Sequence, residues 1–379
     1  MRPYLTVGIV AFIVTYFVTP AVIGLSRRLG AIDHPNDRKV HATPTPTLGG
    51  LAIFAGIMAA GALATRLPYF DGVFTQSSQM IGILGGAVVI FALGAVDDLK
   101  DLPAPVKLAG QVFAAGILFL AGVKMQFVLL PNGDIFSVSD DVSVLLTVGW
   151  MVAMINAVNL IDGLDGLAAG LVAIAASAFF VYTFQLSLNQ GSSAAVFFAP
   201  APLLAMALVG ATLGFLRYNF HPARIFMGDS GSMLLGLVLG GATVAGISNS
   251  SAFGPSLDLG ASGSQVFLAY SPLVIPLLVL ALPIVDAMFA IVRRARRRTS
   301  VFHADKEHLH HRLMDLGHGH RQAVLVMYIW AALAAGAGLA FTFLDRNDVI
   351  FALPVLVGAI VLYTLFPLLT KVVQDRIAP

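Results

Sequence analysis

Long apolar stretches separated by short polar connections dominate the sequence. A helix needs about 20 mostly apolar residues to cross the hydrocarbon core of a bilayer. The first stretch is too long for the apolar part of a signal peptide and lacks a small-residue cleavage site, so it is predicted to be a membrane span. We predict about eleven membrane-spanning helices, at residues 4–26, 47–65, 79–97, 106–123, 142–160, 166–186, 196–216, 231–248, 269–292, 324–344 and 349–370.

The composition agrees with this pattern. Hydrophobic residues make up 58% of the 379 positions and charged residues only 11%, against about 25% in soluble domains. A water-soluble fold of this size could not bury so much apolar surface, so the natural solvent is a bilayer. The chain has no cysteine, which excludes disulfides, thiolate zinc sites and cysteine nucleophiles. The expected fold is therefore an all-α polytopic membrane protein in which residues 1–379 form one integral membrane domain.

The basic residues are distributed unequally between the connections on the two sides of the membrane. Lys and Arg are retained on the cytoplasmic side. One set of alternate connections holds only Arg2, Arg66, Lys124 and Arg346, whereas the other set holds 18 of the 22 basic residues: Arg27, Arg28, Arg38, Lys39, Lys100, Lys107, Arg217, Arg224, Arg293, Arg294, Arg296, Arg297, Arg298, Lys306, Arg312, Arg321, Lys371 and Arg376. We therefore predict a multi-pass membrane protein with its N-terminus outside and its C-terminus in the cytoplasm.

One outer connection carries the pattern of a small strand pair. The segment 125–138 has Asn132-Gly133 between two apolar runs, and Asn-Gly favours the tight turn of a two-stranded hairpin. We predict a short periplasmic β-hairpin here. Because the outer connections carry no group suited to catalysis, the active site is expected at the cytoplasmic face.

Polar residues suited to catalysis gather in the cytoplasmic connections. Ionisable groups at membrane depth cost on the order of 3 kcal/mol each on insertion scales, so their presence indicates a shared task. Five clusters are expected to form one site: Lys39 and His41; Asp97, Asp98 and Lys107; Asn156, Asn159, Asp162 and Asp165; Arg224 and Asp229; and His308, His310, His311 and Arg312.

The charges of these clusters indicate the chemistry. Their five aspartates repel one another unless a cation lies among them. Oxygen ligands without cysteine favour Mg²⁺ or Mn²⁺, and the basic side chains suit phosphate groups. A divalent cation with basic groups is the arrangement that phosphoryl transfer requires. Because the site lies at the membrane boundary, we expect one soluble substrate and one lipid substrate.

Four motifs, in order along nearly the whole chain, resemble those of a known family. Asp97-Asp98 with Lys107 resembles the paired-aspartate signature of the polyprenyl-phosphate N-acetylhexosamine-1-phosphate transferases. Residues 156–167 resemble the Asn-Ala-x-Asn-x-x-Asp-Gly-x-Asp-Gly-Leu block of that family, and residues 226–232 resemble its metal-site segment. Residues 308–313 resemble the histidine motif of the branch that uses UDP-N-acetylglucosamine, whereas the branch that uses UDP-muramoyl-pentapeptide usually has consecutive histidines there.

The resemblance implies a reaction and its partners. N-acetylglucosamine 1-phosphate would pass from UDP-N-acetylglucosamine to a polyprenyl (undecaprenyl) phosphate, releasing UMP and forming a polyprenyl diphosphate-linked sugar. This would be the first membrane step of a cell-envelope polysaccharide, such as teichoic acid or the O-antigen of lipopolysaccharide. The family further implies a location in the bacterial plasma (inner) membrane, Mg²⁺ (or Mn²⁺) as cofactor and a homodimer, with no role for nucleic acid.

The resemblance also implies roles for the matching residues. Asp229 would bind the metal, with Asn159 as a second ligand. Asp97 or Asp98 would orient the lipid phosphate for attack, and Lys107 would neutralise phosphate charge. Asp162 and Asp165 would share a helix face at a spacing of three residues, unless Gly163 interrupts the helix. The expected catalytic set also contains His308, His310 and His311, and the expected substrate-binding set is Lys39, His41, Asn156, Asp162, Asp165, Arg224 and Arg312.

Other interpretations stay open on the sequence. UDP-muramoyl-pentapeptide or another UDP-N-acetylhexosamine would use the same chemistry, and a covalent aspartyl-phosphate route is compatible with it. The spacing of His308, His310 and His311 by itself also fits a transition-metal site. A transporter would need charges near the middle of the bilayer, whereas here they gather at one face. We interpret residues 293–298 as an anchor for anionic lipid headgroups, and His318 and His320 as surface residues.

Overall fold

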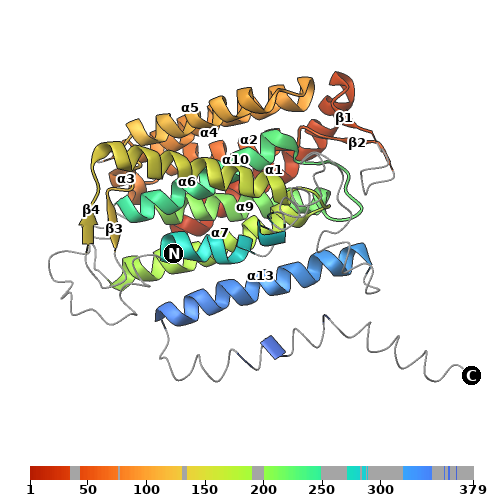
Figure 1. The fold of residues 1–379 in the computed structure, drawn as a ribbon. Coiled ribbons are helices and arrows are strands. Elements are labelled where there is room, and N and C mark those ends of the chain that lie inside the picture. Colours follow the sequence, from red (N-terminus) through yellow and green to blue (C-terminus); the bar gives the residue numbers. More distant parts are fainter. Residues whose placement is uncertain are drawn as a thin grey trace, which may run out of the picture.

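The computed structural model describes residues 1–34, 43–75, 77–129, 135–189, 200–248, 271–281, 284–286 and 319–343, together with residues 288, 354, 357, 358 and 364. Long helices run side by side and form a bundle (Figure 1). Its elements are α1 (Arg2–Leu29), β1 (Ile32–Asp33), β2 (Thr45–Pro46), α2 (Gly50–Ala64), η1 (Pro68–Phe70), α3 (Asp71–Thr75), α4 (Gln79–Lys100), α5 (Ala104–Leu120), β3 (Phe127–Leu129), β4 (Ile135–Ser137), α6 (Asp140–Ile161), α7 (Leu167–Asn189), α9 (Pro200–Asn219), α10 (Gly228–Ser248) and α13 (His320–Phe343).

Seven helices in these ranges are long and apolar enough to cross a membrane, namely α1, α4, α6, α7, α9, α10 and α13. An eighth candidate is α2 taken together with η1 and α3, a pair bent by 91°. Two shorter apolar helices, α5 and Ser271–Ala281, occupy further predicted spans. These helices confirm a mostly helical polytopic membrane protein. The total of eleven stays a prediction, because residues 349–370 lie almost wholly outside the described part of the chain.

Large apolar side chains on the outer helices point away from the bundle. Phe17 of α1 is 71% exposed, Leu145 of α6 is 73% exposed and Leu120 of α5 is 85% exposed. Such exposure is unfavourable in water but matches the hydrocarbon of a bilayer. The outer surface therefore agrees with the membrane setting that the sequence predicts.

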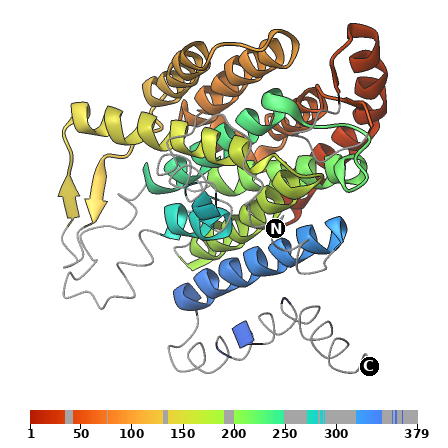
Figure 2. The same ribbon diagram turned by 45° about the vertical axis from the view of Figure 1, so that its right-hand side comes forward.

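α10 is the central helix of the bundle. Its membrane-length stretch is buried along its whole length, and it packs on α2, α4, α6, α7 and α9 (Figure 2). Small residues allow this close packing. At Gly94 of α4, an added Cβ would overlap the backbone of Ser230 near the start of α10. The closeness of α4 and α10 at this point brings their polar ends together.

Two short antiparallel strand pairs lie outside the bundle. β3 and β4 pair with Val128 opposite Phe136, so the two predicted strands are present, whereas the predicted turn at Asn132-Gly133 lies outside the described residues. The location of this strand pair on the periplasmic side stays a prediction. β1 pairs with β2, and the Pro46 carbonyl of β2 accepts the Phe226 N–H at 2.8 Å. This hydrogen bond ties the segment before α2 to the segment that leads into α10.

Candidate active site

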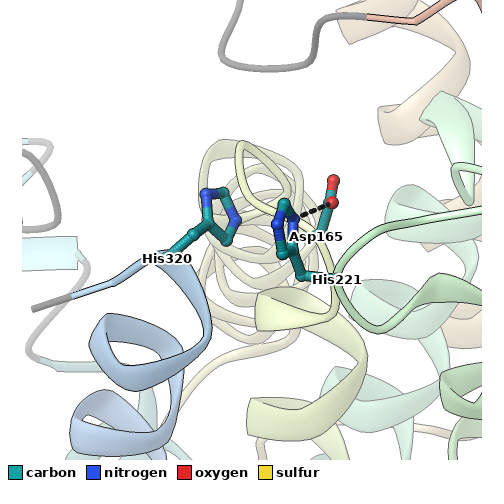
Figure 3. A group of neighbouring side chains, drawn as sticks. All are labelled: Asp165, His221 and His320. Atoms are coloured by element: carbon teal, nitrogen blue, oxygen red, sulfur yellow. Dashed lines mark hydrogen bonds and ion pairs between the residues drawn. The ribbon is translucent and has the colours of Figure 1, made fainter.

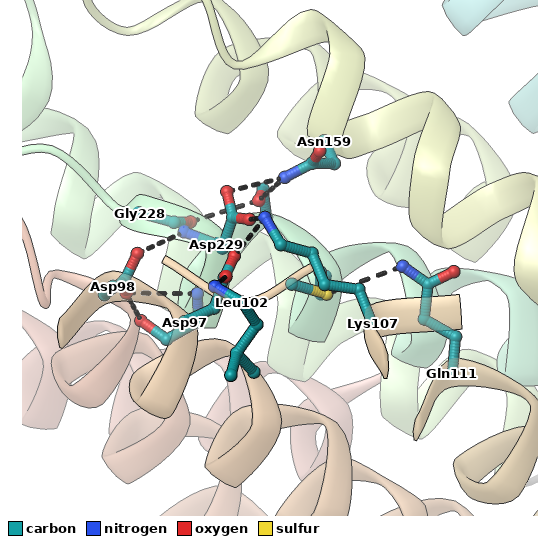
Figure 4. Close-up of polar contacts among 11 residues, drawn as sticks. Asp97, Asp98, Leu102, Lys107, Gln111, Asn159, Gly228 and Asp229 are labelled. Carbon is teal, nitrogen blue, oxygen red and sulfur yellow. Dashed lines mark hydrogen bonds and ion pairs between the residues drawn. The ribbon is translucent and has the colours of Figure 1, made fainter. Parts of the chain in front are cut away.

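Four helix ends meet at one end of the bundle and bring polar residues together (Figure 4). Asp97 and Asp98 come from the C-terminal end of α4, and Lys107 comes from the N-terminal part of α5. Asn159 lies in the last turn of α6, and Asp229 lies in the first turn of α10. Residues from three separate sequence motifs therefore share one site, as the sequence predicts.

The turn between α4 and α5 explains why Asp97 and Lys107 meet. Asp101 adopts a left-handed conformation (φ 52°), which Asp tolerates better than most residues, and its N–H donates to the Asp97 carbonyl at 2.9 Å. The Leu102 N–H donates to the Asp97 carboxylate at 2.7 Å. Pro105 lies in the first turn of α5, where a missing N–H breaks no helical hydrogen bond. α5 therefore begins at Ala104, directly after the turn, and its N-terminal part places Lys107 against Asp97.

Lys107 is the cation among the carboxylates. Its Nζ atom lies 2.5 Å from Asp97 Oδ2 and 3.0 Å from Asp229 Oδ2. The Asp97 side chain is only 3% exposed, whereas Lys107 is 27% and Asp229 31% exposed. Lys107 and Asp229 are therefore the groups that a substrate can reach. Among the described residues, three carboxylates (Asp97, Asp98 and Asp229) face one ammonium group, which gives this cluster a formal charge of −2.

Asp98 binds the beginning of α10. Its carboxylate accepts the Asp229 N–H at 2.7 Å, the Ser230 N–H at 3.2 Å and the Ser230 hydroxyl at 2.6 Å. These bonds satisfy free amides of the helix end and place a negative charge at its positive pole. Gly228 has φ 69°, and a Cβ there would lie 2.5 Å from the Asp98 carboxylate. Only glycine therefore allows this contact, and through it Asp98 fixes Asp229.

Asn159 completes the contacts of Asp229. Its Nδ2 donates to Asp229 Oδ1 at 2.9 Å and to the Ser232 hydroxyl oxygen at 2.9 Å. Within the described part of the chain no group donates a hydrogen bond to Asn159 Oδ1, so this oxygen is a possible ligand atom. Carboxylate and amide oxygens next to two net negative charges are a donor set that suits a hard divalent cation. The residues predicted to bind the metal therefore have the chemistry to hold Mg²⁺.

A pair of amide side chains, the buried Gln111 and the half-buried Asn156, lies beside this cluster. Gln111 is one turn after Lys107 on α5 and is 3% exposed. Its Oε1 accepts a hydrogen bond from Asn156 Nδ2 at 2.7 Å, and the same nitrogen donates to the Val152 carbonyl at 2.7 Å. Gln111 is not among the residues singled out from the sequence. The sequence feature that could have identified Gln111 is its position, four residues after Lys107 on an otherwise apolar helix.

Comparison with known proteins identifies the family. Residues 80–247, which contain every contact of the cluster, match glycosyl transferase family 4. A decaprenyl-phosphate N-acetylglucosaminephosphotransferase of Mycobacterium tuberculosis is 42% identical over 378 residues, which cover 98% of this chain and 90% of the relative. The chain belongs to the polyprenyl-phosphate N-acetylhexosamine-1-phosphate transferases.

Two other relatives represent different branches. The transferase is 38% identical over 325 residues to a probable undecaprenyl-phosphate N-acetylglucosaminyl 1-phosphate transferase of Bacillus subtilis, covering 85% of this chain and 81% of the relative. It is 37% identical over 276 residues to a phospho-N-acetylmuramoyl-pentapeptide-transferase of Mycolicibacterium paratuberculosis, covering 64% of this chain and 76% of the relative. Similarity to the N-acetylglucosamine branch thus extends over more of the chain.

The connection between α6 and α7 holds two further aspartates of the transferase. α6 ends at Ile161 and α7 begins at Leu167, so Asp162 and Asp165 lie in a turn and do not share a helix face. Burial raises the pKa of Asp162 to about 8, and the negative charges of Asp229, Asp98 and Asp165 act in the same direction. Both effects favour the protonated form of Asp162 near neutral pH.

Asp165 is held by the connection between α9 and α10. Its Oδ2 atom lies 2.7 Å from His221 Nδ1 and accepts the Ala223 N–H at 3.0 Å (Figure 3). The interpretation of His320 as a surface residue is wrong: its ring stacks on His221, with centroids 4.1 Å apart and planes 20° apart, and it is half-buried. The contact depends on residues about 100 positions apart, which no local pattern reveals.

The remaining predicted residues are distributed as follows. Arg224 has an exposed side chain in the α9–α10 connection, and its N–H donates to the Tyr218 carbonyl at 2.8 Å. The predicted site residues Lys39, His41, His308, His310, His311 and Arg312 lie outside the described residues, as do the basic residues of 293–298. Their roles stay predictions.

Proposed function

We propose that this transferase moves N-acetylglucosamine 1-phosphate from UDP-N-acetylglucosamine to a polyprenyl phosphate. The observation that carries this proposal is the ion pair of Lys107 with both Asp97 and Asp229, in a cluster with two net negative charges built from four helix ends. The near full-length similarity to a decaprenyl-phosphate N-acetylglucosaminephosphotransferase supports this donor and this kind of acceptor.

The exposure of each side chain indicates its role in the proposed reaction. An oxygen of the lipid phosphate forms a bond to the sugar-bearing phosphorus, while the bond from that phosphorus to the bridging oxygen breaks and UMP leaves with that oxygen. Lys107 can reach substrate and offers its ammonium protons to phosphate oxygens on which charge develops. Asp97 is nearly buried, and its ion pair with Lys107 fixes the position of the ammonium group. Asp98 keeps Asp229 in place through the start of α10.

A divalent cation belongs to the same proposal. Asp229 and Asn159 would hold Mg²⁺ (or Mn²⁺) with the oxygens that face the cluster. When bound, the ion supplies positive charge that neutralises and polarises the diphosphate of the donor.

The proposed orientation puts this end of the bundle in the cytoplasm. α1 ends with Arg27 and Arg28, and the backbone after it reaches β2, which is hydrogen-bonded to Phe226 before α10. Arg217 lies in the last turn of α9. Basic residues thus gather at the same end as the site, as expected for the cytoplasmic side. The N-terminus would lie outside, and a homodimer is part of this proposal.

Purified protein in detergent tests the proposal. Wild type receives Mg²⁺, undecaprenyl phosphate and UDP-N-acetylglucosamine, and UMP release is measured together with lipid-linked sugar. Parallel reactions use UDP-muramoyl-pentapeptide or the Asp229→Ala variant. The expected result is stoichiometric UMP and glycolipid from the first donor only, lost in the variant. Product from the pentapeptide donor, or from neither donor with folded protein, refutes the assignment of the donor.

A further inference from the structure

A second polar group lies beside the cluster and is not used by the mechanism above. Asp165, His221 and His320 come from three separate segments, and their ligand-type atoms lie within 4.8 Å of one another. Figure 3 shows the His221 ring between the other two side chains. The Arg321 Nε donates to the His221 carbonyl at 2.8 Å, so the beginning of α13 contacts both the ring and the backbone of His221.

The geometry does not suit a transition metal. Such an ion needs its ligand atoms to converge on one point at about 2.0–2.2 Å. Two imidazole rings stacked with planes only 20° apart hold their nitrogen lone pairs in nearly parallel planes. Asp165 Oδ2 already binds His221 and the Ala223 N–H. The arrangement therefore supports a fixed orientation of Asp165 better than a metal site.

We propose that His221 is a positioning residue, which fixes Asp165 so that its free oxygen accepts a hydrogen bond from an uncharged donor group of the sugar nucleotide. This inference rests on the proposed function. Both donors that contact Asp165 within the described ranges bind Oδ2, so Oδ1 is the atom left for substrate. The Asp165 side chain is 12% exposed, enough for one oxygen to meet a ligand.

The chemistry of a carboxylate limits what it can bind. Asp165 repels the diphosphate, so it must contact a part of the donor that carries hydrogen-bond donors without negative charge. The hydroxyl groups of the ribose and the hexosamine, the uracil N3–H and the acetamide N–H are such donors. Asp165 follows Asn159 by six residues in the connection after α6, and the Ala223 N–H that binds Asp165 lies six residues before Asp229 in the connection into α10. These two connections bring Asp165 to the same end of the bundle as the cluster, where it can hold one end of the donor while the diphosphate lies near Asp229 and Lys107.

The support of His221 comes mainly from α13. His221 lies in the irregular connection after α9, where no helical hydrogen bonds fix the backbone. The His320 ring covers one face of the imidazole, and Arg321 binds the backbone carbonyl. α13 itself is anchored nearby, because the Tyr328 hydroxyl donates to the Gly166 carbonyl, next to Asp165. A helix distant in sequence thus sets the orientation of Asp165.

A matched pair of amide variants in the full-length protein tests this role. The amide nitrogen of Asn can lie near the position of imidazole Nδ1, whereas that of Gln lies one bond farther along the side chain. We expect His221→Asn to keep the KM for UDP-N-acetylglucosamine within about twofold of wild type, and His221→Gln to raise it at least about tenfold. In both variants, kcat and the KM for undecaprenyl phosphate should change less than about threefold. In an Asp165→Asn background, adding His221→Gln should change the donor KM no further.

Several results would overturn the positioning role. Equal donor KM values for the two amide variants, or additive effects in the double variant, contradict it. If His221→Gln does not fold, His320→Phe keeps a flat ring against His221 and His320→Ala removes it; only the alanine variant should raise the donor KM. An active wild type with unchanged variants refutes the positioning role alone. A folded wild type that releases no UMP from UDP-N-acetylglucosamine refutes the proposed function and this inference with it.

Discussion

Replacing Asp98 by asparagine separates a helix-capping role from a direct role with substrate. Asp98 accepts three hydrogen bonds from the start of α10. Asn keeps one acceptor oxygen but turns an NH₂ group toward donors, so at least one charge-assisted bond is lost and one donor is left unpaired. Bonds to charged groups contribute about 1.5–3 kcal/mol each, and a charge at a helix end adds about 0.3–1 kcal/mol. We expect Asp98→Asn to lose about 2–4 kcal/mol of stability, seen as a Tm lower by about 4–10 °C in detergent.

Asp229→Asn is the matched control for this experiment. The Asp229 carboxylate accepts bonds from the Lys107 and Asn159 side chains and caps no helix. It is also partly exposed, and its loss reduces the repulsion among the carboxylates. We expect its Tm to stay within about 2 °C of wild type, while UMP release is lost in both variants. A normal Tm for inactive Asp98→Asn would show that Asp98 acts on substrate, and the capping argument would be wrong.

Three further predictions concern pH, the amide pair and the cation. The pKa of Asp162 is about 8 in the folded chain against an ordinary value of 3.8, so the folded state retains a proton that the unfolded state releases, and stability falls as pH rises between these values. Asp162→Asn should therefore exceed wild type in Tm by a margin that grows from about pH 5 to about pH 9; a margin that does not change with pH contradicts this. Gln111→Leu leaves Asn156 with only the Val152 carbonyl, and we expect a loss of about 1 kcal/mol in thermal unfolding and a higher donor KM; an unchanged KM means that Asn156 needs no support. Chelation with EDTA should abolish UMP release, and Mg²⁺ or Mn²⁺ should restore it; full activity in EDTA excludes the cation.

The sequence predicts the helices well because apolar length is a local property. The predicted spans 4–26, 79–97 and 142–160 correspond to α1, α4 and α6. The gathering of Asp97, Lys107 and Asp229 is also predictable, because alternate connections of a polytopic protein lie on the same side of the membrane. Contacts between distant helices are not predictable in this way. Asp98 and Asp229 are separated by 131 positions, and only the close packing of α4 on α10 shows that Asp98 faces the helix start.

The fine geometry of the turns is also beyond the sequence pattern. Asp162 and Asp165 have the spacing of a helix face, but α6 stops at Ile161. The Gly163 N–H donates to the Ile161 carbonyl at 2.8 Å, which closes a tight turn in place of another helical turn. Gln111 and His221 carry no motif of their own. Their partners are side chains 45 and 56 positions away, so their place in the site follows from the tertiary fold alone.

The buried position of α10 has a consequence for the order in which the protein is made. The helices that surround it within the described ranges, α2, α4, α6, α7 and α9, all precede it along the chain. During synthesis they enter the membrane while the space between them has no occupant. The central helix arrives later, with the polar sequence Asp229-Ser230-Gly231-Ser232 at its leading end. The site therefore cannot be complete until residues 228–248 have been synthesised and inserted between helices that are made earlier.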